Sequence, residues 1–137
     1  GPLPLSGLMV YPGTRRPLFT SVGGVAIMQT LPADEVRTIL IDNVAQEIER
    51  RGGTRLEALQ KMRERSDRHG FGVNLGDVVP GVHAFGVPVA DLAGNAFAAI
   101  CIIGTGELYP EERIDELREE LFKTSAALSA ESHKFNM

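Results

Sequence analysis

Apolar residues recur at helical spacing in the first half of the chain. Between Pro32 and Gly52 they mark one face of a helix, and two acidic residues follow the proline closely, which suits a first helical turn. The apolar positions of this face are Val36, Ile39, Leu40, Val44 and Ile48. A second helix is predicted from Thr54 to His69, with Glu57 as the capping-box partner of Thr54. The apolar stripe of the second helix consists of Leu56, Leu59 and Met62.

A short helix and a long helix complete the helical pattern. Ser21 precedes the small residues 22–26 and is a suitable N-cap for a short helix there. Pro110 and the acidic pair that follows it open the long helix near the end of the chain. The apolar positions of the long helix are Ile114, Leu117, Leu121 and Leu128.

From Phe71 onward the pattern becomes that of strands. Valines separated by glycine and proline predict strands joined by tight bends. Residues 91–95 form a predicted hairpin turn between a strand at 82–90 and an apolar strand at 96–103, which we expect to lie centrally in the sheet. Residues 1–11 permit an edge strand. This order of elements favours an α+β domain over a doubly wound one.

Length, composition and charge indicate a single globular domain and argue against membrane-spanning, secreted and nucleic-acid-binding proteins. The 137 residues suit one domain, and 43% hydrophobic with 23% charged residues is an ordinary globular composition. No apolar run is long enough to span a membrane and no secretion signal is visible, so a cytoplasmic protein is expected. The net charge of -4 argues against direct binding of nucleic acid. The densest basic stretch, residues 55–68, also carries acids and is interpreted as a solvated helix face.

The sequence contains no motif of a known enzyme or cofactor site. His69, His83 and His133 are too far apart to indicate a metal site, and neither a nucleophilic serine motif nor a phosphate-binding loop is present. On strand alternation, His83 should point away from its neighbours and be a surface or hydrogen-bonded histidine. Cys101, the single cysteine, lies in the most apolar stretch, which predicts a buried thiol with a raised pKa and makes a thiol-based sensor the least favoured function.

Several segments in a fixed order resemble a known family. Together they resemble the C-terminal effector-binding domain of IclR-type bacterial transcriptional regulators, over nearly the whole chain. The segments are PLFTSVGGVA (17–26), LPADEV (31–36), RHGFGVN (68–74), PGVHAFGVPVAD (80–91) and GNAFAAI (94–100). The resemblance implies a GAF-like α+β domain, with a curved antiparallel sheet flanked by helices and a small-molecule pocket between the sheet and the short helix after Ser21. It also implies that residues 1–137 are one sensor domain, without the winged helix-turn-helix domain that holds DNA in such regulators.

The resemblance also implies which residues line the effector pocket. They are Leu5, Leu8, Ser21, Val22, Gly23, Asn74, Val82, Ala84, Cys101 and Ile103. Free N–H groups at the start of the short helix could bind a carboxylate there without a cationic side chain. The alternative for the apolar members, Leu5, Leu8, Val82 and Ile103, is that they are simply core residues.

The pocket departs from relatives that bind small hydrophilic acids. Those relatives carry an acid in place of Asn74, serines in place of Cys101 and Ile103, and a smaller residue in place of Val22. We therefore expect a more apolar pocket and a larger, more aromatic organic acid. The expected function is a non-enzymatic sensor that needs no cofactor and forms a homodimer or tetramer. The alternative is an oligomerisation module whose pocket has lost its ligand.

Overall fold

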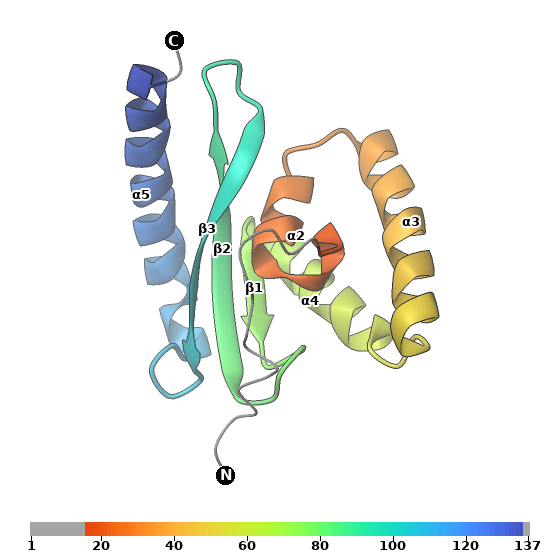
Figure 1. Ribbon diagram of the computed structural model, residues 1–137. Coiled ribbons are helices and arrows are strands. Elements are labelled where there is room, and N and C mark those ends of the chain that lie inside the picture. Colours follow the sequence, from red (N-terminus) through yellow and green to blue (C-terminus); the bar gives the residue numbers. More distant parts are fainter. Residues whose placement is uncertain (1–15, 136–137) are drawn as a thin grey trace.

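The computed structural model describes residues 16–135 (Figure 1). The predicted first strand, with Leu5 and Leu8, lies outside this range. The elements in order are η1 (Leu18–Thr20), α2 (Val22–Met28), α3 (Ala33–Arg51), α4 (Leu56–His69), β1 (Gly72–Leu75), β2 (Val82–Ala90), β3 (Ala96–Thr105), η2 (Glu111–Arg113) and α5 (Ile114–Phe135). Among the helices of the described range, none is both long enough and apolar enough to cross a membrane.

The helix boundaries follow local signals in most places. The Ser21 side chain caps α2 by accepting a hydrogen bond from the Gly24 N–H at 3.1 Å, as predicted. Helix α3 ends at Gly52, whose φ of 71° is the left-handed conformation that glycine adopts easily. The predicted capping box of α4 is wrong, because the N-cap is Arg55 and no side chain caps the helix.

The three strands form an antiparallel sheet in the order β1-β2-β3. Asp91 closes the predicted hairpin, since its carboxylate accepts hydrogen bonds from the N–H groups of Ala93 and Asn95. Within the described residues β2 is the central strand and β3 lies at an edge. The central position expected for 96–103 stays a prediction, because the predicted first strand of the chain lies outside these residues. One face of that segment packs against α5, and the other face is only partly covered by α2. Ile100 and Ile102 pack on the α5 side, and Ala99 and Cys101 lie next to Gly23 of α2.

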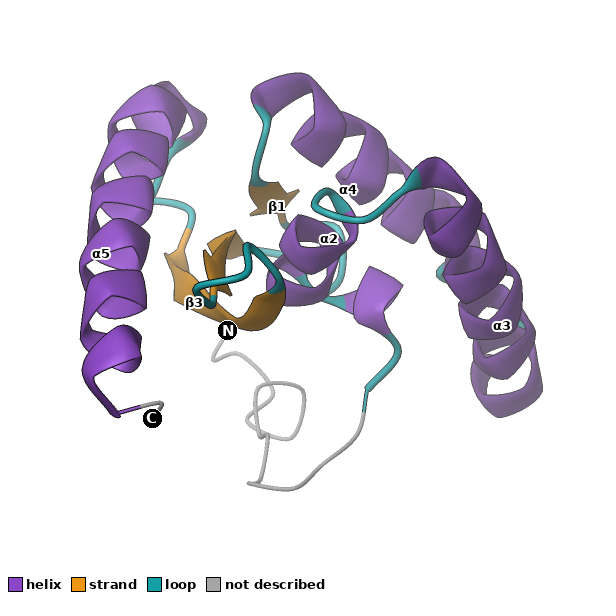
Figure 2. Ribbon diagram, turned by 90° about the horizontal axis from the view of Figure 1, so that it is seen from above, coloured by secondary structure: helices purple, strands orange, loops and turns teal. Residues whose placement is uncertain are grey.

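Helices cover both faces of the sheet and create two separate cores (Figures 1 and 2). On one face, α5 packs on β2 through a cluster of Phe71, Val73, Phe85, Val87, Ile114, Leu117 and Leu121. On the other face, α2 and α4 pack around a cluster of Phe19, Val22, Val25, Met28, Leu59, Met62 and Ala84. Because side chains alternate along a strand, β2 contributes Ala84 to one core and Phe85 to the other.

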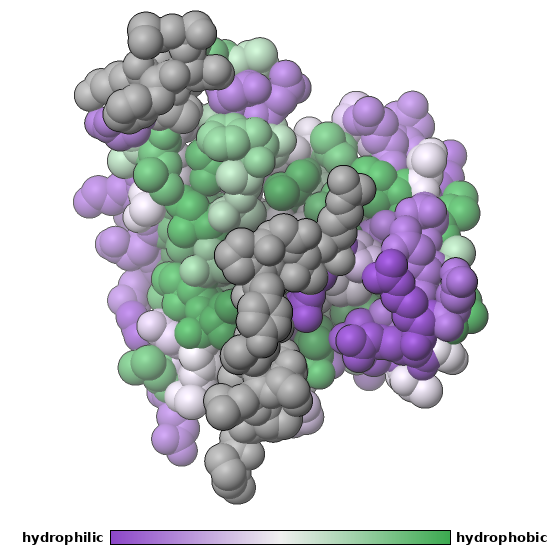
Figure 3. Space-filling model, in the orientation of Figure 1, coloured by the Kyte–Doolittle hydropathy of each residue, from purple (hydrophilic) through white to green (hydrophobic). Residues whose placement is uncertain are grey.

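Helix α3 is the outermost layer and contributes little apolar burial. Its predicted apolar stripe is only half-buried, and Ile48 is exposed. The fully buried side chains of α3 are two polar ones, Asn43 and Glu47. Figure 3 accordingly shows a largely hydrophilic surface over α3 and hydrophobic residues gathered over β3. At the other end of the chain, Leu128 of α5 is also exposed, unlike the three apolar positions before it.

Candidate functional site

The strand register brings several predicted pocket residues onto one face of the sheet. Asn74 of β1 lies opposite Ala84 of β2, and Ala84 lies opposite Ile103 of β3. These three residues form a row across the sheet on the face that meets α2. The next row on the same face consists of Gly72, Gly86 and Cys101. The resemblance therefore identified residues that are adjacent in space although they are far apart in the sequence.

The start of α2 lies directly on the glycine row. A Cβ atom on Gly72 would overlap the carbonyl group of Val22, and one on Gly86 would lie 3.1 Å from the Gly23 nitrogen. Gly23 faces β3, because a Cβ atom there would lie 3.1 Å from the Cys101 sulfur. Glycine is required at these contacts because helix and sheet backbones approach each other without intervening side chains.

Asn74 is the polar residue of the first row, and it is only 7% exposed. Its Oδ1 atom accepts a hydrogen bond from the Asp77 N–H at 2.9 Å. Within the described part of the chain, no hydrogen bond is formed by its Nδ2 group, which has two N–H donors. A buried amide with unused donors is uncommon, because an unmade hydrogen bond costs free energy when water is excluded.

The turn after Asn74 is held in place by an ion pair. Arg65 of α4 donates two hydrogen bonds to the Asp77 carboxylate, at 2.6 and 3.2 Å. The Leu75 N–H donates to the same carboxylate at 2.9 Å. The interpretation of residues 55–68 as a solvated face is therefore wrong in part, because Arg65 fixes the loop that orients Asn74.

Strand β3 carries exposed apolar side chains. Ile103 is 63% exposed and Phe97 is 58% exposed. Cys101 is exposed as well, which corrects the prediction of a buried thiol. Partial desolvation nevertheless raises the pKa of Cys101, opposed by a hydrogen bond from the Gly23 backbone. The neutral thiol therefore dominates near pH 7, and this gives no support to a reactive cysteine.

The remaining predicted residues have structural partners. Val22 belongs to the buried cluster of α2, and Val82 is 6% exposed. The Ser21 hydroxyl is used as the α2 cap. His83 points to the opposite face, as predicted, and its Nδ1 atom lies 2.9 Å from the Tyr109 carbonyl oxygen. Within residues 16–131, whose side chains are described, no group of three His, Cys, Asp or Glu residues is arranged to hold a metal ion.

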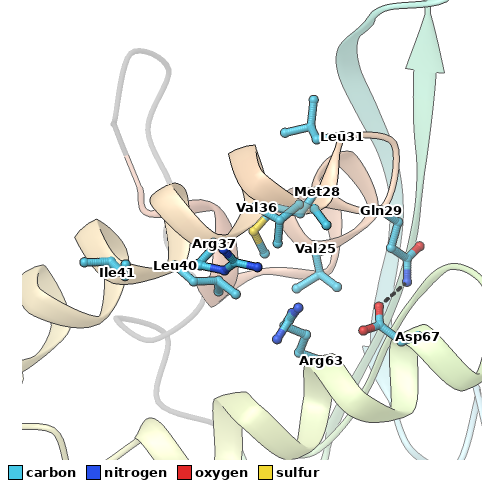
Figure 4. Close-up of a pocket in the computed structure, with 11 residues that line it drawn as sticks. Val25, Met28, Gln29, Leu31, Val36, Arg37, Leu40, Ile41, Arg63 and Asp67 are labelled. Carbon is cyan, nitrogen blue, oxygen red and sulfur yellow. Dashed lines mark hydrogen bonds between the residues drawn. The ribbon is translucent and has the colours of Figure 1, made fainter.

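A groove that was not predicted from the sequence lies on the far side of α2. It has a volume of about 510 Å³ and is bounded by α2, α3 and α4 (Figure 4). A second hollow of about 680 Å³ lies between α3 and the segment from Arg16 to Leu18. Neither hollow is lined by a residue predicted for the effector pocket. The only signal for the groove was the basic stretch 55–68, which contributes Arg63.

Comparison with solved structures finds the same fold in bacterial regulators. The Agrobacterium tumefaciens repressor BlcR is 25% identical with a TM-score of 0.71, over 91% of this chain and 51% of that one. The C-terminal domain of the Escherichia coli transcriptional regulator KdgR is 26% identical with a TM-score of 0.67, over 88% of this chain and 74% of that one. Pseudomonas aeruginosa HmgR is 25% identical with a TM-score of 0.63, over 90% of this chain and 48% of that one. The chain thus spans about half the length of BlcR and HmgR.

Sequence comparison assigns the family. No curated protein sequence gives a significant match to the chain. The family described as "Bacterial transcriptional regulator IclR C-terminal" matches residues 6–130. This range includes every residue predicted for the pocket except Leu5. The chain therefore belongs to the IclR C-terminal family of bacterial transcriptional regulators.

Proposed function

We propose that this regulatory domain senses an organic acid, bound on the sheet face beside Asn74. The domain has no catalytic role in this proposal. It self-associates, and effector binding changes the geometry between subunits. Because BlcR and HmgR are about twice as long as this chain, we place DNA binding in a separate winged helix-turn-helix domain of the whole regulator.

The unused donors of Asn74 are the main support for the proposal. The amide is buried, and Asp77 and Arg65 fix its orientation through the turn that follows. A carboxylate oxygen of a ligand would accept the hydrogen bond that Nδ2 does not make within the described chain. Binding would then satisfy a polar group that is costly to leave unpaired.

The neighbouring side chains favour an acid with an apolar body. Ala84 and Ile103 share the row of Asn74, and Cys101 in the next row carries no charge near pH 7. Phe97, nearer the start of β3, is a further exposed apolar side chain of this strand. An aromatic ring would gain free energy by covering this surface, whereas an acid of two or three carbons would leave it in water.

The test is a calorimetric and thermal-shift titration with benzoate, phenylacetate, glyoxylate and pyruvate. Asn74→Asp keeps the oxygen that accepts from the Asp77 N–H and replaces the amide donors with a negative group. We expect wild type to bind an aromatic acid and this variant to lose at least about tenfold in affinity. Asn95→Asp makes the same chemical change in the exposed hairpin turn and should bind as wild type. Equal binding by all three proteins would refute the role of Asn74, and a preference for glyoxylate or pyruvate would refute the ligand class.

An assembly module without an effector is the second candidate. It is favoured by the exposed apolar side chains of α5, Phe122 and Leu128, which are 41% and 45% exposed. Analytical ultracentrifugation with and without the acids separates the two functions. A stable oligomer together with no thermal shift for any acid would favour the assembly module.

A further inference from the structure

The groove between α2, α3 and α4 combines apolar walls with two arginines. Its apolar lining comes from all three boundaries of the groove: Val25, Met28, Leu31, Val36, Leu40 and Ile41. The cationic groups are Arg37 of α3 and Arg63 of α4. The volume of about 510 Å³ lies within the range of small-molecule sites, roughly 300–1,000 Å³.

The two guanidinium groups have no counter-ion in the described part of the chain. Figure 4 shows that Arg37 and Arg63 extend from different helices, and both line the groove. Neither forms an ion pair or a hydrogen bond with any residue of the described range. Asp67 is the acidic residue of the lining, and its carboxylate accepts a hydrogen bond from Gln29 at 3.2 Å. Two like charges that converge on an apolar surface repel each other, and an anion between them would reverse that repulsion.

We propose that this groove is a second ligand site, separate from the sheet face, and that it binds a carboxylate with an apolar body. Arg37 and Arg63 hold the carboxylate from two sides, since planar guanidinium groups match carboxylate geometry. The side chains of Val36, Leu40 and Ile41, which are more accessible than Val25 and Met28, contact the apolar part. This proposal does not depend on the one for Asn74, because no residue is common to the two sites.

The attachment of α3 gives the second site a means of regulation. Half-buried apolar side chains of α3 pack against the core, and two polar contacts beyond the middle of the helix fix its fully buried side chains. The Asn43 side chain accepts from the Phe19 N–H at 3.2 Å, and Glu47 is paired with Arg55. The first half of α3 carries Arg37 and borders the groove, but it has no fully buried side chain. A ligand that bridges Arg37 and Arg63 would fasten this half of α3 to α2 and α4.

The experiment uses 2-naphthoate as the probe and its neutral analogue 2-naphthamide. Isothermal titration calorimetry is performed on wild type, on the double variant R37Q/R63Q and on R68Q. Arg68 lies on α4, the helix of Arg63, and is exposed. It forms no ion pair within the described residues and does not line the groove, so R68Q is the control. Each titration is repeated in the N74D background, which removes binding at the sheet face.

We expect 2-naphthoate to bind in the N74D background and R37Q/R63Q to weaken that binding at least about tenfold. R68Q should change the affinity less than about twofold, and 2-naphthamide should bind more weakly than the acid. Circular dichroism checks that the variants are folded. The proposal is overturned if N74D abolishes all binding, if R37Q/R63Q binds like wild type, or if R68Q weakens binding as much as the double variant. If the groove proposal fails in the N74D background, the proposal for the Asn74 site still stands. That site is tested separately, in proteins that keep Arg37 and Arg63.

Discussion

The ion pair between Glu47 and Arg55 gives the sharpest test of how α3 is attached. Arg55 donates two hydrogen bonds of 2.8 Å to the Glu47 carboxylate. The Glu47 side chain is 3% exposed, and the Arg55 side chain is 25% exposed. Glu47→Gln removes the charge and keeps one acceptor, so it leaves a partly buried guanidinium without a counter-ion.

The expected loss follows from this geometry. A hydrogen bond to a charged group contributes about 1.5–3 kcal/mol. Because Gln retains one acceptor and Arg55 reaches solvent, we expect the free energy of unfolding to fall by about 2 kcal/mol. For a domain of this size that corresponds to a fall of about 6–8 °C in Tm. Glu57→Gln is the matched control, since Glu57 and its partner Lys61 are 85% and 65% exposed and 3.5 Å apart. The control should change stability by less than about 0.5 kcal/mol.

The assay is urea unfolding followed by circular dichroism, as a double-mutant cycle with Arg55→Met and as a function of pH. The hydrogen bonds from Arg55 lower the pKa of Glu47 in the folded protein. The stabilisation is therefore complete above the unfolded value of about 4.3 and is lost as the pH falls through the lower folded value. The difference between wild type and Glu47→Gln should shrink over that window. A coupling energy below about 0.5 kcal/mol, or a difference that grows on acidification, would refute the reasoning.

Three further predictions concern the sheet and its neighbours. Gly72→Ala should lower the free energy of unfolding by about 3 kcal/mol, because the new Cβ atom overlaps the carbonyl group of Val22; an unchanged urea midpoint would contradict the close contact. Ser66→Ala should lower the free energy of unfolding by about 1–3 kcal/mol, because it leaves the buried N–H of Val73 without its acceptor at 2.8 Å. An unchanged free energy of unfolding in the same urea assay would contradict this role of Ser66. Alkylation of Cys101 by iodoacetamide should be slower near pH 7 than that of glutathione and should rise with pH, because its pKa is raised; faster alkylation than glutathione would contradict it.

Features that depend on local sequence were predicted well. The Ser21 cap, the limits of β2 at Val82 and Ala90 and the hairpin after Asp91 agree with the structure. Each is decided by residues within a few positions of one another, through turn chemistry or capping. The family resemblance added the non-local part, since it selected Asn74 and Ile103 before the register placed them in one row.

Features that depend on distant partners were not predicted. Arg65 was assigned to a solvated surface because its partner, Asp77, belongs to a different element. Thr54 is a residue type that often caps helices. The N-cap of α4 is nevertheless Arg55, which is paired with Glu47 of α3. Cys101 lies in an apolar run and is exposed, because the described elements do not cover the outer part of β3. Tertiary contacts decided all three cases.

The contact between α2 and the glycine row limits how this domain can change shape. At Gly72 and Gly86 the two layers meet through main-chain atoms, and no side chain is available there to rotate into a new position. If a ligand displaces α2 at this contact, side chains cannot repack there to accommodate the displacement. The helix must shift as a rigid unit, by tilting or sliding over the strands in a shear motion. Because Val22 and Val25 of α2 are packed into the cluster that contains Leu59 of α4, such a shift would be passed to α4.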